Sequence, residues 1–169
     1  MAVVYLSIGS NVDRAKNLQL AIDELGKRFS HLQLSDIYEN SPVGFAGNDF
    51  LNLVVSADTT SEPKEVAWQL EEIHDIAGRD REGEKFAPRE LDIDLLLYDN
   101  RVIDGPDLVL PRPDILQYAF VLRPLAELAP SLQHPVTGKA LAEHWAEFDQ
   151  GSHPLRRVAG LLASHADAT

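Results

Sequence analysis

Residues 88–98 read Pro-Arg-Glu-Leu-Asp-Ile-Asp-Leu-Leu-Leu-Tyr, a polar start followed by an apolar run. Side chains of a β-strand alternate between the two faces of a sheet, so Asp92 and Asp94 project to the same face. The opposite face receives Leu91, Ile93 and Leu95. Asp is disfavoured in strands, and two carboxylates on one strand face repel each other unless a cation lies between them. The stretch therefore predicts an inner strand that presents an acid pair.

A divalent cation with oxygen ligands, typically Mg²⁺, would relieve this repulsion, with water and phosphate oxygens completing its coordination. The loop that leads into the strand is rich in cations suited to polyphosphate. These cations are Arg79, Arg81, Lys85 and Arg89. An acid pair next to a basic loop indicates metal-assisted phosphoryl transfer. The alternative is a solvated polar strand face without a ligand.

The whole chain, residues 1–169, is predicted to form one domain. Its formal net charge of −12 argues against a nucleic-acid partner, because Lys and Arg supply most of the affinity for a phosphate backbone. There is no cysteine, which excludes disulfides and thiolate metal sites. Neither a secretory signal nor an apolar run long enough to span a membrane is found. We expect a cytoplasmic monomer, with a dimer as the alternative.

The hydrophobic pattern predicts an α+β fold of the ferredoxin-like β-α-β-β-α-β type, a mainly antiparallel sheet with helices packed on it. The six elements are expected at about residues 3–9, 13–29, 32–36, 50–57, 62–77 and 91–98, with Gly78 ending the second helix. A tight turn at Asp99-Asn100 indicates a hairpin into residues 101–103. A short helix is expected at 124–128, and the tail after about residue 135 has weak periodicity.

Familiar nucleotide-binding and hydrolase signatures are missing. The chain has neither a P-loop nor a Rossmann glycine motif, and neither a His-Glu-x-x-His nor a Gly-x-Ser-x-Gly element. A bound nucleotide would therefore be held by side-chain cations and metal. One aromatic is unusual: Phe50 lies on the polar face of its strand, beside Asn52. An aromatic ring can stack on a flat heterocycle and an amide can read its edge, although an ordinary strand start is the alternative.

Together these segments resemble the 6-hydroxymethyl-7,8-dihydropterin pyrophosphokinase family of the folate pathway. The Pro-Arg-Glu-Leu-Asp-Ile-Asp element at residues 88–94 is close to diagnostic, and the likeness spans residues 3 to about 130. The matching stretches are residues 5–11, 41–44, 50–52, 78–81, 87–94 and 120–127. The resemblance implies a ferredoxin-like fold and the transfer of pyrophosphate from ATP to the pterin hydroxymethyl group, with release of AMP.

The resemblance also implies roles for individual residues. Asp92 and Asp94 would hold two Mg²⁺ ions that bridge the ATP phosphates and the attacking hydroxyl. The phosphates would be contacted by five cations, Arg79, Arg81, Lys85, Arg89 and Arg112. The adenine pocket would be lined by Leu95 and Leu110. The pterin would lie between Phe50 and Phe120, near Ser41, Pro42, Val43 and Asn52, with Phe86 closing the site.

Three positions depart from the family pattern. Arg112 stands where family members commonly carry His, Tyr118 where a basic residue is frequent, and His74 where an acid is expected. Arg112 can still meet a phosphate, so the departures concern nucleotide affinity more than the reaction. Two other functions are considered: a diverged pterin- or nucleotide-binding module without transfer activity, and a metal-dependent phosphohydrolase that uses the same carboxylates.

Overall fold

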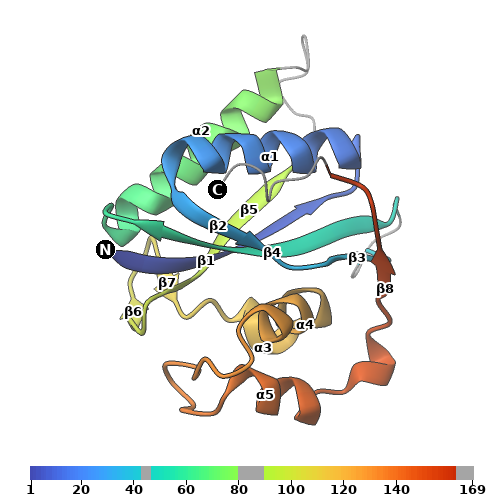
Figure 1. Cartoon of the computed structure of the whole chain (residues 1–169). Helices are drawn as coiled ribbons and strands as arrows, with labels where there is room; N and C mark the ends of the chain where they lie inside the picture. Colours follow the sequence, from blue (N-terminus) through green and yellow to red (C-terminus); the bar gives the residue numbers. More distant parts are fainter. Residues whose placement is uncertain (43–46, 80–89, 163–169) are drawn as a thin grey trace.

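The computed structural model describes residues 1–42, 47–79 and 90–162, in which helices cover both faces of a sheet (Figure 1). The strands are β1 (Ala2–Ser10), β2 (Ser30–Leu34), β3 (Ile37–Asn40), β4 (Phe50–Thr59), β5 (Asp92–Tyr98), β6 (Ile103–Asp104), β7 (Val109–Leu110) and β8 (Arg156–Val158). The helices are α1 (Arg14–Arg28), α2 (Pro63–Arg79), α3 (Asp114–Gln117), α4 (Ala119–Leu128), α5 (Leu141–Glu147) and the 3₁₀ segment η1 (Gln150–Ser152).

The main sheet is antiparallel, with the strand order β5-β1-β4-β3-β8 and β2 also paired to β4. The predicted β-α-β-β-α-β order is present as β1, α1, β2 with β3, β4, α2 and β5. Helices α1 and α2 lie on one face of this sheet (Figure 1). The α+β prediction is confirmed, but the prediction of an inner strand for the acid pair is wrong, because β5 is an edge strand of the sheet. Its apolar run is buried because both of its faces are covered by a hydrophobic core.

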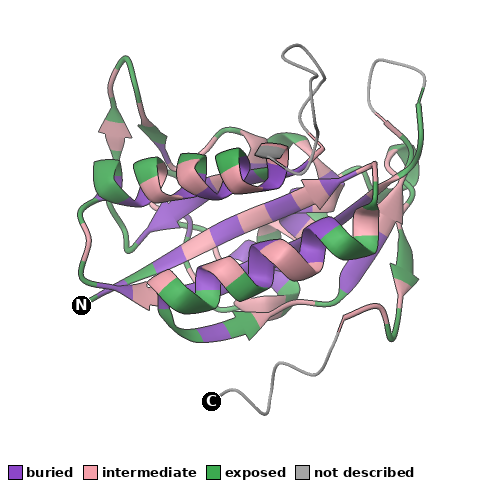
Figure 2. Cartoon of the chain, turned by 90° about the horizontal axis from the view of Figure 1, so that it is seen from above, coloured by how far each residue is buried: buried purple, intermediate pink, exposed green. Residues whose placement is uncertain are grey.

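The main core lies between the sheet and the two long helices. Buried and less buried residues alternate along β1 (Figure 2), because only one strand face meets α1 and α2. The apolar residues at helical spacing in both predicted helices are buried: Leu18, Ile22 and Leu25 in α1, and Val66, Leu70 and Ile73 in α2. Helix α2 runs one residue past Gly78, which was expected to end it.

A second core covers the opposite face of the sheet, where α4 packs against β4 and β3. Its members include Val54, Leu96, Val121 and Leu125. The predicted short helix at 124–128 is wrong in length, because α4 begins at Ala119 and Pro124 lies inside it. Proline favours the first turn of a helix and opposes its interior. Here the buried apolar face of α4 outweighs that preference.

The strand predicted at 32–36 is divided into β2 and β3. At the break, the Ser35 backbone N–H donates to the Val54 carbonyl, and the Ser35 hydroxyl accepts from the Val54 N–H, each at 2.9 Å. The hydroxyl takes the place of a backbone carbonyl in the ladder, so regular pairing stops there. Both pieces still pair with β4.

The hairpin predicted at Asp99-Asn100 is wrong, although the chain does turn there. Asp99 has a left-handed backbone (φ 48°), and its carboxylate accepts the Val3 N–H at 2.8 Å. This contact fastens the turn to β1. The following strand β6 pairs with β7 and not with β5.

The tail adds a strand that its weak periodicity did not predict. Strand β8 pairs with β3, and its two arginines reach acidic side chains of the body. Arg156 pairs with Glu39, and Arg157 lies 3.2 Å from Asp36. None of the helices described combines the length and the apolar composition that crossing a membrane would require.

Candidate active site

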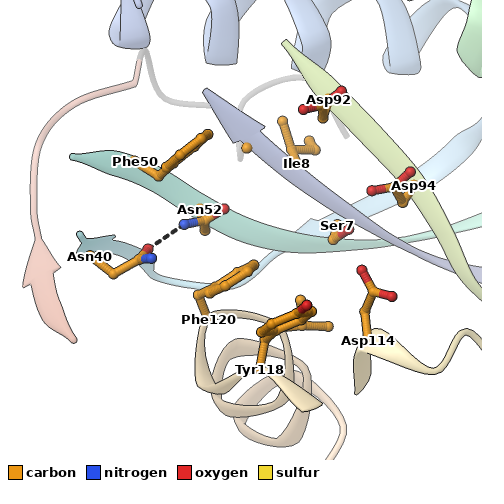
Figure 3. Close-up of a pocket in the computed structure, with 12 residues that line it drawn as sticks. Ser7, Ile8, Asn40, Phe50, Asn52, Asp92, Asp94, Asp114, Tyr118 and Phe120 are labelled. Carbon is orange, nitrogen blue, oxygen red and sulfur yellow. Dashed lines mark hydrogen bonds between the residues drawn. The ribbon is translucent and has the colours of Figure 1, made fainter. Parts of the chain in front are cut away.

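A cavity of about 280 Å³ opens on the sheet face that carries the second core, at the start of α4 (Figure 3). Four strands of the sheet and the segment around α3 and α4 contribute to it. Its lining residues are Ser7, Ile8, Gly9, Asn40, Phe50, Asn52, Asp92, Asp94, Asp114, Tyr118, Phe120 and Val121. Ligand pockets are roughly 300–1,000 Å³, so the volume suits a small ring system.

The acid pair lies at one side of the cavity. Asp92 and Asp94 both line it, as expected from their spacing on the strand (Figure 3). On the other face of β5, Ile93 and Leu95 are buried in the main core. In the ladder with β1, Asp92 lies opposite Gly9 and Asp94 lies opposite Ser7. Both carboxylates therefore stand over a stretch of β1 that has small side chains.

Within the described residues, Arg112 forms an ion pair with one member of the acid pair, Asp94. Its guanidinium lies 3.6 Å from an Asp94 oxygen and 3.3 Å from an Asp114 oxygen. Burial raises the pKa of the Asp94 carboxyl, and the Arg112 guanidinium opposes that rise. The carboxylates of Asp92 and Asp114 add to it. Among the described residues, one arginine thus faces three carboxylates, which suits a site that receives a further cation.

The raised pKa of Asp94 leads to a prediction about stability. The folded chain holds this proton more tightly than the unfolded chain, so the free energy of unfolding falls as pH rises through the interval between the two pKa values. The ionised carboxylate then destabilises the fold at pH 7. Asp94→Asn is expected to raise the Tm of the metal-free protein by about 2 °C or less, because solvent screens a partly exposed group.

Differential scanning calorimetry at pH 7 in the presence of a chelator measures this effect. The exposed Asp107 provides a matched control, since Asp107→Asn makes the same chemical change away from the cavity. A lower Tm for Asp94→Asn than for the wild type would contradict the prediction.

The donor set at this site fits a hard cation, because it consists of carboxylate oxygens. In the part of the chain that the structure describes, no three His, Cys, Asp or Glu side chains gather as a metal cluster of their own. Mg²⁺ that binds together with substrate phosphates is commonly held by one or two carboxylates of the protein. The residues present therefore suit a metal that arrives with a nucleotide.

The other side of the cavity is aromatic and amide-rich. Phe50 and Phe120 both line it, and the Asn52 side chain lies between β1 and β3 (Figure 3). The Asn52 amide nitrogen donates to the Asn40 side-chain oxygen, which fixes the orientation of the buried Asn52 carboxamide. The Asn52 oxygen then points toward Gly9: a Cβ at Gly9 would lie 2.6 Å from it. Glycine at this position leaves that oxygen accessible to a ligand.

Two further features of the cavity were not predicted from the sequence as site features. Asp114 follows Arg112 by two residues, and no strand or helix pattern links it to β5. The Tyr118 ring stacks on the Phe120 ring, with centroids 5.0 Å apart and an interplanar angle of 18°. Tyr118 was noted only as a departure from the family pattern. The sequence feature that could have identified Tyr118 as a site residue is its position two residues before Phe120.

Several predicted site residues do not line this cavity. Leu95 and Leu110 are buried in the main core, and Ser41 and Pro42 follow β3, next to Asn40. Arg79 ends α2, and the placement of its side chain is outside the description. Five predicted residues lie outside the described part of the chain: Val43, Arg81, Lys85, Phe86 and Arg89.

Comparison with known proteins identifies relatives. The family model for 7,8-dihydro-6-hydroxymethylpterin-pyrophosphokinase matches residues 5–130. The chain is 38% identical to 2-amino-4-hydroxy-6-hydroxymethyldihydropteridine pyrophosphokinase of Aquifex aeolicus, over 85% of this chain and 90% of that protein. It is 34% identical to a folic acid synthesis protein of Pneumocystis carinii, over 86% of this chain but 20% of that protein.

A solved structure supports the fold. The HPPK-DHPS protein of Plasmodium falciparum matches with a TM-score of 0.70 at 12% identity. The match covers 86% of this chain, which spans 45% of that longer one. At this identity the likeness shows a common architecture alone.

Proposed function

The chain belongs to the 7,8-dihydro-6-hydroxymethylpterin-pyrophosphokinase family, and we propose that the cavity between Asp92 and Phe120 is the active site of this reaction. The enzyme transfers pyrophosphate from ATP to the hydroxymethyl group of 6-hydroxymethyl-7,8-dihydropterin in folate synthesis, which leaves AMP. The transfer requires two binding regions, one for a polyphosphate with its metal and one for a flat pterin ring.

One row of cross-strand neighbours carries the proposal. Asp92 of β5 lies opposite Gly9 of β1, which lies opposite Asn52 of β4. Neighbouring strands are about 4.8 Å apart, so the acid and the amide are separated by roughly 10 Å across β1. The glycine between them leaves room for a bicyclic ring on the sheet. A pterin that is hydrogen-bonded to Asn52 at one end would thus direct its hydroxymethyl group toward Asp92.

On the polyphosphate side, we assign Asp92 and Asp94 to two Mg²⁺ ions that come with ATP. Bound Mg²⁺ would neutralise charge on the attacking and leaving oxygens. The basic residues Arg79, Arg81, Lys85, Arg89 and Arg112 would contact the phosphates. Phosphoryl-type transfer needs in-line positioning and charge neutralisation more than a protein nucleophile.

On the pterin side, we assign Phe50 and Phe120 to the two faces of the ring. Asn52 would pair with the ring edge, because its oxygen accepts and its nitrogen donates. Ser41, Pro42, Val43 and Phe86 would complete this end of the site. We place the adenine near Leu95 and Leu110, where the edge of β5 approaches β7. We further propose that the enzyme is cytoplasmic, because ATP is available in that compartment, and that it is a monomer.

AMP formation tests the function directly. The full chain is incubated with ATP, Mg²⁺ and 6-hydroxymethyl-7,8-dihydropterin, and AMP and the pterin diphosphate are expected in equal amounts. A binding module would bind the pterin without forming AMP. A phosphohydrolase would release orthophosphate without a pterin acceptor. Either of these outcomes would overturn the assignment of the reaction to this site.

The aromatic side of the cavity gives a second prediction. Phe120→Ala is expected to weaken pterin binding by on the order of 1 kcal/mol, roughly fivefold, because one stacking face is lost. The affinity for ATP should change little. Isothermal titration calorimetry with each substrate measures both affinities. Phe148→Ala is a matched control, because Phe148 stacks on Trp145 and does not line the cavity. Weaker ATP binding with unchanged pterin binding would contradict the assignment.

A further inference from the structure

A histidine of α2 contacts the backbone between the two acids of β5. His74 has a side chain that is 5% exposed. Its Nε2 accepts the backbone N–H of Ile93 at 2.8 Å, in a buried hydrogen bond. Ile93 is the single residue between Asp92 and Asp94. We propose that His74 is a positioning residue, which fixes the spacing of these two carboxylates through the peptide group of Ile93.

The position of β5 in the sheet makes this contact necessary. In an antiparallel ladder, backbone N–H groups point alternately toward the partner strand and away from it. The Ile93 N–H points away from β1, and β5 is an edge strand, so none of the described strands accepts this proton. A buried N–H without an acceptor destabilises the fold. His74 supplies the acceptor from the helix that covers this edge.

The hydrogen bond also determines the form of the imidazole. With Nε2 as the acceptor, Nδ1 is the ring nitrogen that can carry the proton. Nδ1 lies 3.3 Å from an oxygen of Glu71, one helical turn earlier. The imidazole is thus positioned by Glu71 on α2 through Nδ1, and it binds the backbone of β5 through Nε2.

The consequence for the acids follows from the alternation of the strand. The Ile93 side chain is buried in the main core, while the flanking carboxylates face the cavity. Residues 92–94 are therefore held by β1 at one edge and by His74 at the other. A metal that bridges two carboxylates depends on their separation, and partners that orient ligands commonly change metal affinity by 10–100-fold. His74 would act on the metal without touching it.

The inference rests on the proposed role of Asp92 and Asp94, and its test uses the metal alone. Mn²⁺ serves as the probe, because it prefers the same oxygen ligands as Mg²⁺ and is detected by electron paramagnetic resonance. His74→Leu removes the acceptor and is expected to weaken Mn²⁺ binding on the order of tenfold. His74→Gln places an amide oxygen at a similar reach and should restore affinity close to that of the wild type. Amide exchange at Ile93, followed by NMR, should accelerate in His74→Leu and not in His74→Gln.

Leu70→Ala separates this role from a general loss of packing. Leu70 is buried on the same helix and does not contact the cavity, so its truncation should lower the Tm and leave Mn²⁺ affinity unchanged. If His74→Leu does not fold, His74→Ala serves as the variant without an acceptor. Wild-type Mn²⁺ affinity in the variant without an acceptor would overturn the inference, and so would an equal loss in Leu70→Ala. Because ATP and pterin are absent, the inference can fail while AMP formation succeeds.

Discussion

Asp92→Ala and Asp94→Ala are each expected to lower the rate of AMP formation by roughly two to four powers of ten, which corresponds to about 3–5 kcal/mol of barrier. Both side chains line the cavity and neither supports the main core. Loss of either carboxylate would leave the metal with one protein ligand, so the phosphates and the attacking hydroxyl would lose their common anchor. The fold should remain intact, since repulsion within the acid pair is relieved.

The measurement is kcat for Mg²⁺-dependent AMP formation, with circular dichroism and Tm as checks on folding. Asp107→Ala is the matched control, because it removes an exposed carboxylate in the turn between β6 and β7. A single variant with nearly normal Mg²⁺-dependent turnover would contradict the metal assignment. A loss of turnover that accompanies unfolding would be resolved with Asp→Asn variants, which keep the side-chain volume.

The elements that the sequence predicted well are those whose burial is regular. Strand β4 and helix α2 each carry an apolar stripe with the period of their own structure, so Leu53 and Ile73 could be placed in the core beforehand. The elements that it missed depend on distant partners. Strand β8 is short and charged, and it forms because Arg157 finds Asp36 and because β3 has a free edge. The full length of α4 depends on the second core, which overrides Pro124.

The site residues likewise fall into those that a local pattern predicts and those that depend on distant partners. Strand alternation places Asp92 and Asp94 on a common face of β5. The same rule places Phe50 and Asn52 on a common face of β4. Their meeting across Gly9 could not be read from either segment, because it depends on the register of β1 with both neighbours. Asp114 belongs to a segment whose placement is set by packing on the sheet. Local patterns thus identify which side chains face a cavity, whereas the sheet register decides which of them meet.

Arg112 gives the last prediction, in which metal affinity and turnover are expected to change in opposite directions. Its guanidinium lies 3.6 Å from an Asp94 oxygen and 3.3 Å from an Asp114 oxygen. A cation in this position competes with a metal for the same carboxylate. Arg112→Ala is therefore expected to strengthen the binding of Mn²⁺ in the absence of nucleotide. With ATP present, the same variant should lose a phosphate contact, and kcat should fall by about 100-fold, the effect of one preorganised donor.

Arg112→Lys separates charge from geometry. Lysine keeps the positive charge near Asp94 but lacks the planar fork that can bridge a carboxylate and a phosphate. It should leave Mn²⁺ affinity close to that of the wild type and recover only part of the lost turnover. Mn²⁺ titration and single-turnover AMP formation on the wild type and both variants measure the two quantities independently. If Arg112→Ala weakened Mn²⁺ binding and left kcat unchanged, Arg112 would only orient Asp94. If Mn²⁺ affinity rises while kcat falls, the Arg112 guanidinium neutralises carboxylate charge before ATP binds and phosphate charge afterwards.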